Sequence, residues 1–386
     1  MHDFVLPIGP QHPSIKEPTC LRITLDGNYI QEARIRLGYQ HRGVEKLMEG
    51  KEIGKALHIV GRICGICTYA HTNCFTQTIE KMANIEIPKR VKMIRTIMTE
   101  LERLQSHMLW LGFMFHEIGL DTYFMYFWRD RERVIDIFER VTGGRIHHHI
   151  NRFGSVAYDI REPDVRLIKE ELEKIKLNVE RYLSTLEKDH IVKKRMVDVG
   201  IISRHDAKRY CLVGPVARAS GIRIDVRKDV PYDAYDLVSF DLITENAGDS
   251  YSRTLVRIRE VFESIKIIRR LLKTMPNEKL PKPEIPSIKE GLEWGMVEAP
   301  RGEDFHFVSV KNNVIQRHRI RPPTFNYISI LEPLLKGAEI GDVPVITASL
   351  DPCFACLERV IIVRNGREKG YNEQTFKQKF SRYKHV

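Results

Sequence analysis

The segment Arg62-Ile63-Cys64-Gly65-Ile66-Cys67 and the segment Asp351-Pro352-Cys353-Phe354-Ala355-Cys356 each carry two cysteines with two residues between them. Two thiolates at this spacing reach one metal ion, so a fold that joins the two segments makes a site of four sulfurs. Thiolates select soft or borderline metals such as zinc, iron in clusters, nickel or copper. A structural zinc site is the commonest outcome of such pairs, but zinc usually stabilises small local modules. Here most of a large chain separates the two pairs.

The composition is that of a globular protein with a substantial core, since 42% of the 386 residues are hydrophobic. The formal net charge of +11 is compatible with nucleic acid, anionic lipid or an acidic protein partner. No nucleic-acid-binding motif is visible, so we do not expect nucleic acid. No apolar run approaches the roughly 20 residues that a membrane span requires, and the N-terminus shows no secretory signal pattern. We therefore expect any membrane association to depend on partner subunits.

The remaining three cysteines, Cys20, Cys74 and Cys211, show no pairing pattern. We expect them to be small buried side chains in a reducing compartment.

The pattern of apolar residues predicts an N-terminal hairpin and several long helices. Residues 21–25 and 29–37 alternate around the turn Asp26-Gly27-Asn28, as paired strands do. Apolar residues recur every three or four positions over three stretches that we expect to pack as a helical bundle, 88–115, 163–186 and 252–275. After a proline-rich connector at 276–286, we expect strands at 295–297 and 305–311, a helix at 326–335 and a buried strand at 343–350.

These elements predict an α+β fold that is mainly helical, with a central helical bundle and small peripheral β-sheets. We expect a single domain over residues 1–359. Within it we expect a β-hairpin region at about 1–40, the bundle at about 44–275 and a region that delivers residues to the site at about 290–359. Residues 360–386 form a basic tail, in which 360–363 and Asn365-Gly366 suggest a short hairpin.

Further motifs accompany the cysteine segments along the chain: Gly9-Pro10-Gln11-His12-Pro13, Glu17-Pro18, Gly38-Tyr39-Gln40-His41-Arg42-Gly43-Val44-Glu45-Lys46, Gly214-Pro215-Val216-Ala217-Arg218 and Glu298-Ala299-Pro300-Arg301-Gly302. In this order they make the chain similar to the large catalytic subunit of a nickel-iron (NiFe) hydrogenase. The resemblance covers nearly the whole chain and is to the energy-converting, membrane-associated group 4, which is related to the 49-kDa-type subunit of respiratory complex I. It implies the NiFe-hydrogenase large-subunit fold, in which the cysteine pairs meet at the base of the bundle.

The resemblance also implies a metal centre. Nickel would be bound by Cys64, Cys67, Cys353 and Cys356, and Cys67 and Cys356 would bridge to an iron that carries CO and CN ligands. Cys353 is the expected proton acceptor when dihydrogen is split. Arg301 matches the arginine above the metals, where its charge can polarise dihydrogen. Asp351 is expected to pair with Arg301 and to fix its orientation.

Several other residues are candidates by position. His71 would share a helix face with Cys67 and donate a hydrogen bond to a bridging sulfur, and the alternative is an ordinary core histidine. Glu17 would relay the proton away from the terminal cysteine, and the alternative is a solvated glutamate. A segment expected to face the small subunit and the proton path contains Tyr39, His41, Arg42 and Glu45. The run 147–149 consists of three histidines, which alternate in an extended segment and so cannot converge on one ion.

We expect no iron-sulfur cluster in this chain, because no further cysteine cluster is visible. By resemblance, electrons would come from ferredoxin through a small subunit that carries a proximal 4Fe-4S cluster. Other soluble and membrane subunits would complete the complex, with this chain on the cytoplasmic side of the cell membrane. In many relatives a C-terminal peptide is removed during maturation, and the corresponding cut would follow Arg359. The sequence leaves open whether this tail is removed.

The function implied by resemblance is reversible proton reduction and dihydrogen oxidation, coupled to ferredoxin and ion translocation. One alternative is a related membrane complex subunit that reduces sulfane sulfur or quinone. Quinone-type relatives lack the full set of cysteines, whereas a sulfur-reducing protein need not differ in its ligands. A second alternative is a non-catalytic scaffold with a structural zinc site of four cysteines.

Overall fold

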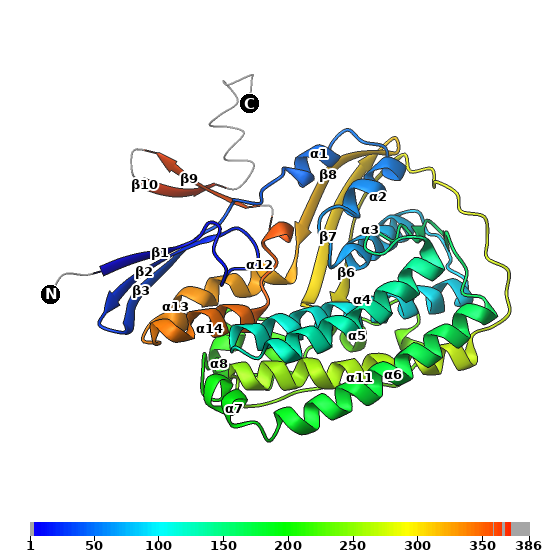
Figure 1. Ribbon diagram of the computed structural model, residues 1–386. Helices are drawn as coiled ribbons and strands as arrows, with labels where there is room; N and C mark the ends of the chain where they lie inside the picture. The colour runs from blue at the N-terminus through cyan, green and yellow to red at the C-terminus, as the bar shows by residue number, and fades with distance from the viewer. Residues whose placement is uncertain (1–3, 358, 365–366, 372–386) are drawn as a thin grey trace.

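The computed structural model describes residues 4–357, 359–364 and 367–371. Long helices form a bundle along one side of the molecule. A three-stranded sheet, β6–β7–β8, stands over this bundle, and a second sheet, β1–β2–β3, lies at one end (Figure 1). The predicted fold class, mainly helical with small antiparallel sheets, is confirmed.

The bundle consists of α4 (Lys89–Glu117), α5 (Asp121–Thr142), α6 (Glu162–Leu186) and α11 (Ser250–Thr274). Helix α4 packs against α5 and α11, and both of these pack against α6. Along α4, fully buried apolar side chains recur at the predicted spacing, as at Ile94, Ile97 and Leu101. Asp249 caps the start of helix α11, and its side chain accepts a hydrogen bond from the backbone N–H of Ser252. Helices α4, α6 and α11 match the prediction, but α5 was not predicted from the sequence.

A buried ionic cluster stabilises the inside of the bundle. Glu100 on α4 pairs with Arg103 at 3.2 Å and with Arg227 at 3.1 Å, and it accepts a hydrogen bond from Ser264 Oγ at 2.6 Å. Burial raises the pKa of Glu100, but the two arginines outweigh burial and lower it to about 2. The carboxylate therefore stays charged at neutral pH and compensates two buried guanidinium groups.

The N-terminal sheet is formed by β1 (Phe4–Ile8), β2 (Cys20–Asp26) and β3 (Tyr29–Arg36), and the larger sheet by β6 (Glu290–Ala299), β7 (Gly302–Lys311) and β8 (Val314–Arg321). All neighbouring strands are antiparallel. The hairpin β2–β3 matches the prediction, whereas β6 is longer than predicted and β8 was not predicted. Helix α3 packs against β6 and β7, and this contact joins the first cysteine segment to the sheet.

The shorter elements before the large sheet are α1 (Val44–Met48), α2 (Ile53–Val60), α3 (Thr68–Met82), β4 (Asn151–Arg152), β5 (Ser155–Val156), α7 (His190–Met196), α8 (Arg204–Arg209), α9 (Gly214–Arg218), α10 (Val226–Asp229) and the 3₁₀ helix η1 (Tyr235–Leu237). After this sheet come α12 (Pro323–Tyr327), η2 (Ile328–Ile330), α13 (Leu331–Leu335), η3 (Ile340–Asp342), α14 (Val343–Leu350) and η4 (Phe354–Cys356). The helix predicted at 326–335 is thus divided into three short pieces.

The prediction of a buried strand at 343–350 is wrong, because this segment is helix α14. Its residues are apolar or small on every side, so neither the strand period nor the helix period is visible in the sequence. Pro344 in the first turn is compatible with a helix start. Cys20 and Cys74 are buried as expected, but Cys211 is exposed, so that expectation is wrong.

In the C-terminal tail, β9 (Val360–Arg364) and β10 (Arg367–Tyr371) pair antiparallel, as predicted for a hairpin. Residues 365–366, where the hairpin turn was predicted, and the basic stretch at 372–386 lie outside the described residues. None of the helices in the described ranges combines the length and apolarity that a bilayer crossing requires.

We expect the substitution Glu100→Gln to lower the free energy of unfolding by about 3 kcal/mol at neutral pH, because Arg103 and Arg227 lose the charge that compensates them. The pKa of Glu100 is lowered from 4.5 to about 2 on folding. Its stabilising contribution is therefore present above the higher value and is lost as the pH falls toward the lower one. Chemical denaturation at several pH values should show that the difference in the free energy of unfolding between the wild type and Glu100→Gln becomes smaller in acid.

The matched control is Glu180→Gln, which alters an exposed glutamate on α6 that pairs with the half-buried Lys176. This change should alter the free energy of unfolding by less than about 0.5 kcal/mol. Equal effects of the two substitutions would contradict a stabilising role for the Glu100 cluster.

Candidate metal centre

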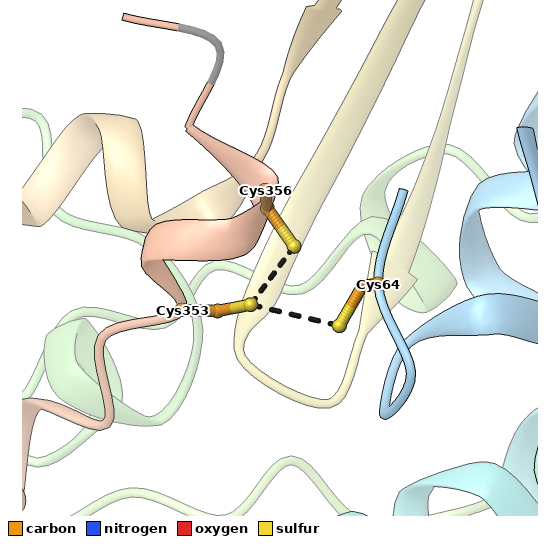
Figure 2. Close-up of side chains that lie close together, drawn as sticks. All are labelled: Cys64, Cys353 and Cys356. Carbon is orange, nitrogen blue, oxygen red and sulfur yellow. Dashed lines mark hydrogen bonds between the residues drawn. The ribbon is translucent and has the colours of Figure 1, made fainter. Parts of the chain in front are cut away.

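The two cysteine segments meet in the folded protein (Figure 2). Cys64 and Cys67 lie in the loop before α3, Cys353 lies between α14 and η4, and Cys356 is the last residue of η4. Cys353 Sγ is 3.5 Å from Cys64 Sγ and 3.0 Å from Cys356 Sγ. All four side chains are buried free thiols. Sulfurs from residues 289 positions apart in the chain therefore form one cluster.

Cys67 lies on the side of the cluster that faces Arg301. Its backbone N–H donates to Cys64 Sγ at 3.3 Å, and its own Sγ accepts a hydrogen bond from Arg301 Nη1 at 3.3 Å. Hydrogen bonds from the other thiols lower the pKa of Cys64, whereas the hydrogen bond to Cys64 and burial raise the pKa of Cys67. The four thiols ionise together only beside a compensating cation. This donor set fits nickel, iron or another soft or borderline metal.

Arg42 connects the two cysteine segments through backbone oxygens. Its guanidinium donates to the carbonyls of Arg62, at 2.9 Å, and Ile63 in the first segment and to the carbonyl of Ala355 in the second, at 3.0 Å. A planar group with five donors suits such a bridge. From the sequence, Arg42 was expected only at the partner face and proton path, and its link between the segments was not foreseen.

Arg301 and Asp351 form a buried two-point contact beside the thiols. Arg301 Nη2 donates to Asp351 Oδ1 at 2.8 Å, and Arg301 Nε donates to the backbone carbonyl of Asp351 at 3.0 Å. Tyr327 Oη donates to the same carbonyl at 3.0 Å. Burial lowers the pKa of Arg301, but Asp351 and the thiolates of Cys67 and Cys353 outweigh it and raise that pKa, so the guanidinium keeps its charge.

A close approach of two backbones holds Arg301 in this position. A Cβ atom on Gly214 would lie 2.2 Å from the carbonyl oxygen of Arg301, and a Cβ on Gly302 would lie 2.8 Å from the nitrogen of Gly214. Both glycines also have positive φ angles, 65° and 126°. The two motifs that contain these glycines are therefore packed against each other.

His71 lies in the first turn of α3 and contacts the second cysteine segment. Its Nε2 is 3.5 Å from Cys356 Sγ, and its Nδ1 is 2.8 Å from Asp304 Oδ2. Burial lowers the pKa of His71, but the charge and hydrogen bond of Asp304 outweigh burial and raise it. The sulfur next to His71 thus belongs to Cys356 rather than to its helix neighbour Cys67.

Glu17 approaches the second cysteine segment from the loop between β1 and β2. Its Oε2 accepts a hydrogen bond from the backbone N–H of Ala355 at 2.8 Å, and it also interacts with the Cys353 thiol. Burial and the charge of Cys64 raise the pKa of Glu17, and the two hydrogen bonds act in the opposite direction. Of the candidates outside the cysteine segments, Glu17 is the carboxylate beside the thiols.

The other candidates of the 39–45 segment lie in different environments. Tyr39 and His41 are exposed. Glu45 is buried, accepts a hydrogen bond from the backbone N–H of Ile320 at 2.9 Å and pairs with Arg319 at 2.5 Å. Glu45 therefore links α1 to β8. Its expected roles in partner contact and in the proton path stay predictions.

The three consecutive histidines do not converge. The ring of His148 stacks on Phe138 with the centroids 3.7 Å apart, His147 Nδ1 lies 3.2 Å from Thr68 Oγ1, and His149 Nε2 lies 2.7 Å from Arg62 Nη1. The three side chains thus contact different partners, but the predicted extended backbone is not found, since His149 has a left-handed φ of 47°.

Several residues around the site were not found from the sequence. Glu102 on α4 accepts hydrogen bonds from the backbone N–H groups of Tyr69, at 2.5 Å, and Ala70, at 2.8 Å, in the first turn of α3. Burial raises the pKa of Glu102 to about 8. Thr324 Oγ1 accepts a hydrogen bond from the backbone N–H of Cys353 at 3.0 Å. A motif could not have indicated Glu102 or Thr324, because each is far from the cysteines in the chain.

A cavity of about 180 Å³ adjoins Arg301, Asp351 and Glu17. Its wall is largely apolar and includes Ile15, Leu109, Trp110, Phe113, Trp128 and Phe354. A small apolar or polarisable molecule can therefore approach the charged pair through this space.

Two family models match the sequence. The model described as respiratory-chain NADH dehydrogenase, 49 Kd subunit, matches residues 117–290 and 282–359. The model described as nickel-dependent hydrogenase matches residues 42–122, which include the first cysteine segment.

Similar proteins come from several kinds of complex. The membrane-bound hydrogenase subunit alpha of Pyrococcus furiosus is 35% identical over 380 residues, covering 94% of this chain and 89% of that protein. A subunit of the NADH-quinone oxidoreductase of Dehalococcoides mccartyi is 34% identical over 360 residues, covering 92% of this chain and 98% of that protein. A chain in the structure of the membrane-bound sulfane sulfur reductase, an archaeal respiratory membrane complex, has a TM-score of 0.88 at 28% identity, covering 92% of this chain and 98% of that one.

We expect Arg42→Met to reduce the amount of metal retained by the purified protein, because the two cysteine segments lose their shared hydrogen-bond donor. The measurement is metal content after purification and after dialysis against a chelator. The control, Lys55→Met, alters an exposed side chain on α2 that pairs with exposed Glu52. Unchanged metal retention in Arg42→Met would show that the bridge is dispensable.

Proposed function

Since this chain belongs to the family of the 49-kDa subunit of respiratory NADH dehydrogenase and of nickel-dependent hydrogenases, we propose that it is the catalytic subunit of an energy-converting NiFe hydrogenase. The reaction is reversible proton reduction and dihydrogen oxidation. One observation carries this proposal: four buried cysteines from distant parts of the chain converge beside a buried Arg301–Asp351 pair. A structural zinc site would not require that charged pair.

A bound nickel-iron centre supplies the redox chemistry of dihydrogen. Cys64, Cys67, Cys353 and Cys356 would hold it. The CO and CN ligands on the iron come from maturation enzymes.

The charged side chains around the thiols have separate roles. Arg301 keeps a permanent positive charge in a buried site, where it polarises dihydrogen. Asp351 fixes the guanidinium through its side chain and its backbone carbonyl. Glu17 receives the proton from the Cys353 sulfur, since its carboxyl group interacts with that thiol and its pKa is raised.

The partners proposed for this chain follow from the lack of a further cysteine cluster among the described residues. Cys20, Cys74 and Cys211 form no cluster there, so the 4Fe-4S relay is assigned to a small subunit. The exposed residues Tyr39 and His41 lie near the Arg42 bridge in sequence and are assigned to that interface. Ferredoxin supplies electrons indirectly, and membrane subunits on the cytoplasmic face carry out ion translocation.

A second candidate function is the reduction of sulfane sulfur. The apolar cavity beside Arg301 is larger than dihydrogen needs, and the similar solved structure is that of a sulfane sulfur reductase. Because the cysteine ligands need not differ between the two reactions, assays of both substrates are required.

The purified complex should contain nickel and iron, show infrared bands of iron-bound CO and CN, and evolve dihydrogen from reduced viologen. Cys353→Ser should abolish dihydrogen evolution, because the site loses a terminal thiolate. Cys211→Ser, which alters an exposed cysteine outside the site, should leave the activity unchanged. Zinc without nickel would contradict the proposal, and reduction of polysulfide without dihydrogen evolution would favour the second candidate.

Glu17→Gln should slow dihydrogen evolution by roughly 100-fold or more, because the amide does not accept the proton from Cys353. The metal content and infrared bands should stay close to those of the wild type. The control Glu32→Gln alters an exposed carboxylate on β3 and should have no effect on the rate. A wild-type rate in Glu17→Gln would assign the proton route to another residue.

A further inference from the structure

A row of buried side chains extends from Cys356 into the hairpin β7–β8. It consists of His71, Asp304, His306 and His318, none of which is more than 1% exposed. His71 Nδ1 lies 2.8 Å from Asp304 Oδ2 and 3.1 Å from His306 Nε2. His306 Nε2 lies 3.3 Å from the same Asp304 oxygen, and His306 Nδ1 lies 3.0 Å from His318 Nε2. None of the roles proposed above accounts for Asp304, His306 or His318.

The carboxylate acts on the two nearest rings through its charge. Asp304 Oδ2 lies 2.8 Å from His71 Nδ1 and 3.3 Å from His306 Nε2, so it attracts both rings by ion-pair contacts rather than by well-aligned hydrogen bonds. The two ring nitrogens also contact each other at 3.1 Å. When His71 faces the carboxylate with Nδ1–H and donates Nε2–H to Cys356, it carries a hydrogen on both nitrogens. Asp304 therefore lies where it can orient His71.

The fold places Asp304 by the same hairpin turn that places Arg301. Strand β7 begins at Gly302, directly after Arg301, and Asp304 is in register with Val297 on β6. The carbonyl oxygen of Asp304 lies 3.6 Å from the sulfur of Cys74 on α3, one turn after His71. Strand β7 and helix α3 are therefore in contact beside His71.

We propose that Asp304 is a positioning residue that fixes the His71 ring so that Nε2–H is donated to the sulfur of Cys356. His306 and His318 hold Asp304 in place. This inference rests on the proposed function, in which Cys356 would be a ligand of the nickel-iron centre. A hydrogen bond to a thiolate withdraws electron density from the sulfur, and outer-shell partners of metal ligands tune a centre in this way. The infrared stretching frequencies of CO and CN ligands on the iron would change with that electron density.

The test is infrared spectroscopy of the purified complex with wild-type chain, Asp304→Asn, His71→Leu and Asp233→Asn. Loss of the hydrogen bond makes the sulfur a stronger donor, so the CO band of His71→Leu should move to lower wavenumber. Asp304→Asn should move it in the same direction by a smaller amount. The control residue Asp233 is also a buried carboxylate bound to α3, through Asn73 at 2.8 Å and Gln77 at 3.0 Å. Its substitution should leave the band in place.

Each other outcome is decisive. An unchanged band in loaded Asp304→Asn or in His71→Leu would overturn the inference. Loss of nickel in both aspartate variants would assign Asp304 to folding and overturn it as well. An additional equivalent of zinc in the wild type that disappears only in Asp304→Asn would show that a cation, rather than hydrogen bonds, joins the His71, Asp304 and His306 cluster. If the wild-type complex lacks nickel and the bands, the proposed function itself fails.

Discussion

Four sulfur atoms in one buried cluster impose the constraint on which the rest of this structure depends. Thiolates in a low-dielectric interior repel one another, so the surrounding protein must supply positive charge and hydrogen-bond donors. Arg301 supplies a buried charge, and Arg42 holds the two segments together without competing for the sulfurs. The ionic clusters farther inside the bundle keep these supports in position, since Arg218 pairs with Glu298, three residues before Arg301.

Most of the fold could be predicted from the sequence, because long helices with one buried face show apolar residues every three or four positions. Helices α4, α6 and α11 were predictable for this reason. Helix α14 was not, because it is apolar on every side and has no visible period. The cysteines and Arg301 were predictable from motif spacing and resemblance. Asp304, Thr324 and Glu102 were not, because their contacts depend on the tertiary fold rather than on a local pattern.

The contacts that hold the two cysteine segments together are separate from the side chains that could carry out a reaction. Similar chains can therefore occur in a hydrogenase, an NADH-quinone oxidoreductase and a sulfane sulfur reductase. Arg42 contacts backbone oxygens of the two segments, so this bridge does not depend on which side chains the segments carry. The packing of Gly214 against Arg301 is likewise a contact between backbones. Neither contact requires a particular side chain in the cysteine segments.

The separation of the two cysteine segments also governs the order of biogenesis. Cys64 leaves the ribosome long before Cys353, which follows 289 residues later. The cluster of four thiols therefore does not exist during most of translation. An ion that needs all four sulfurs can be enclosed only after the second segment has been synthesised.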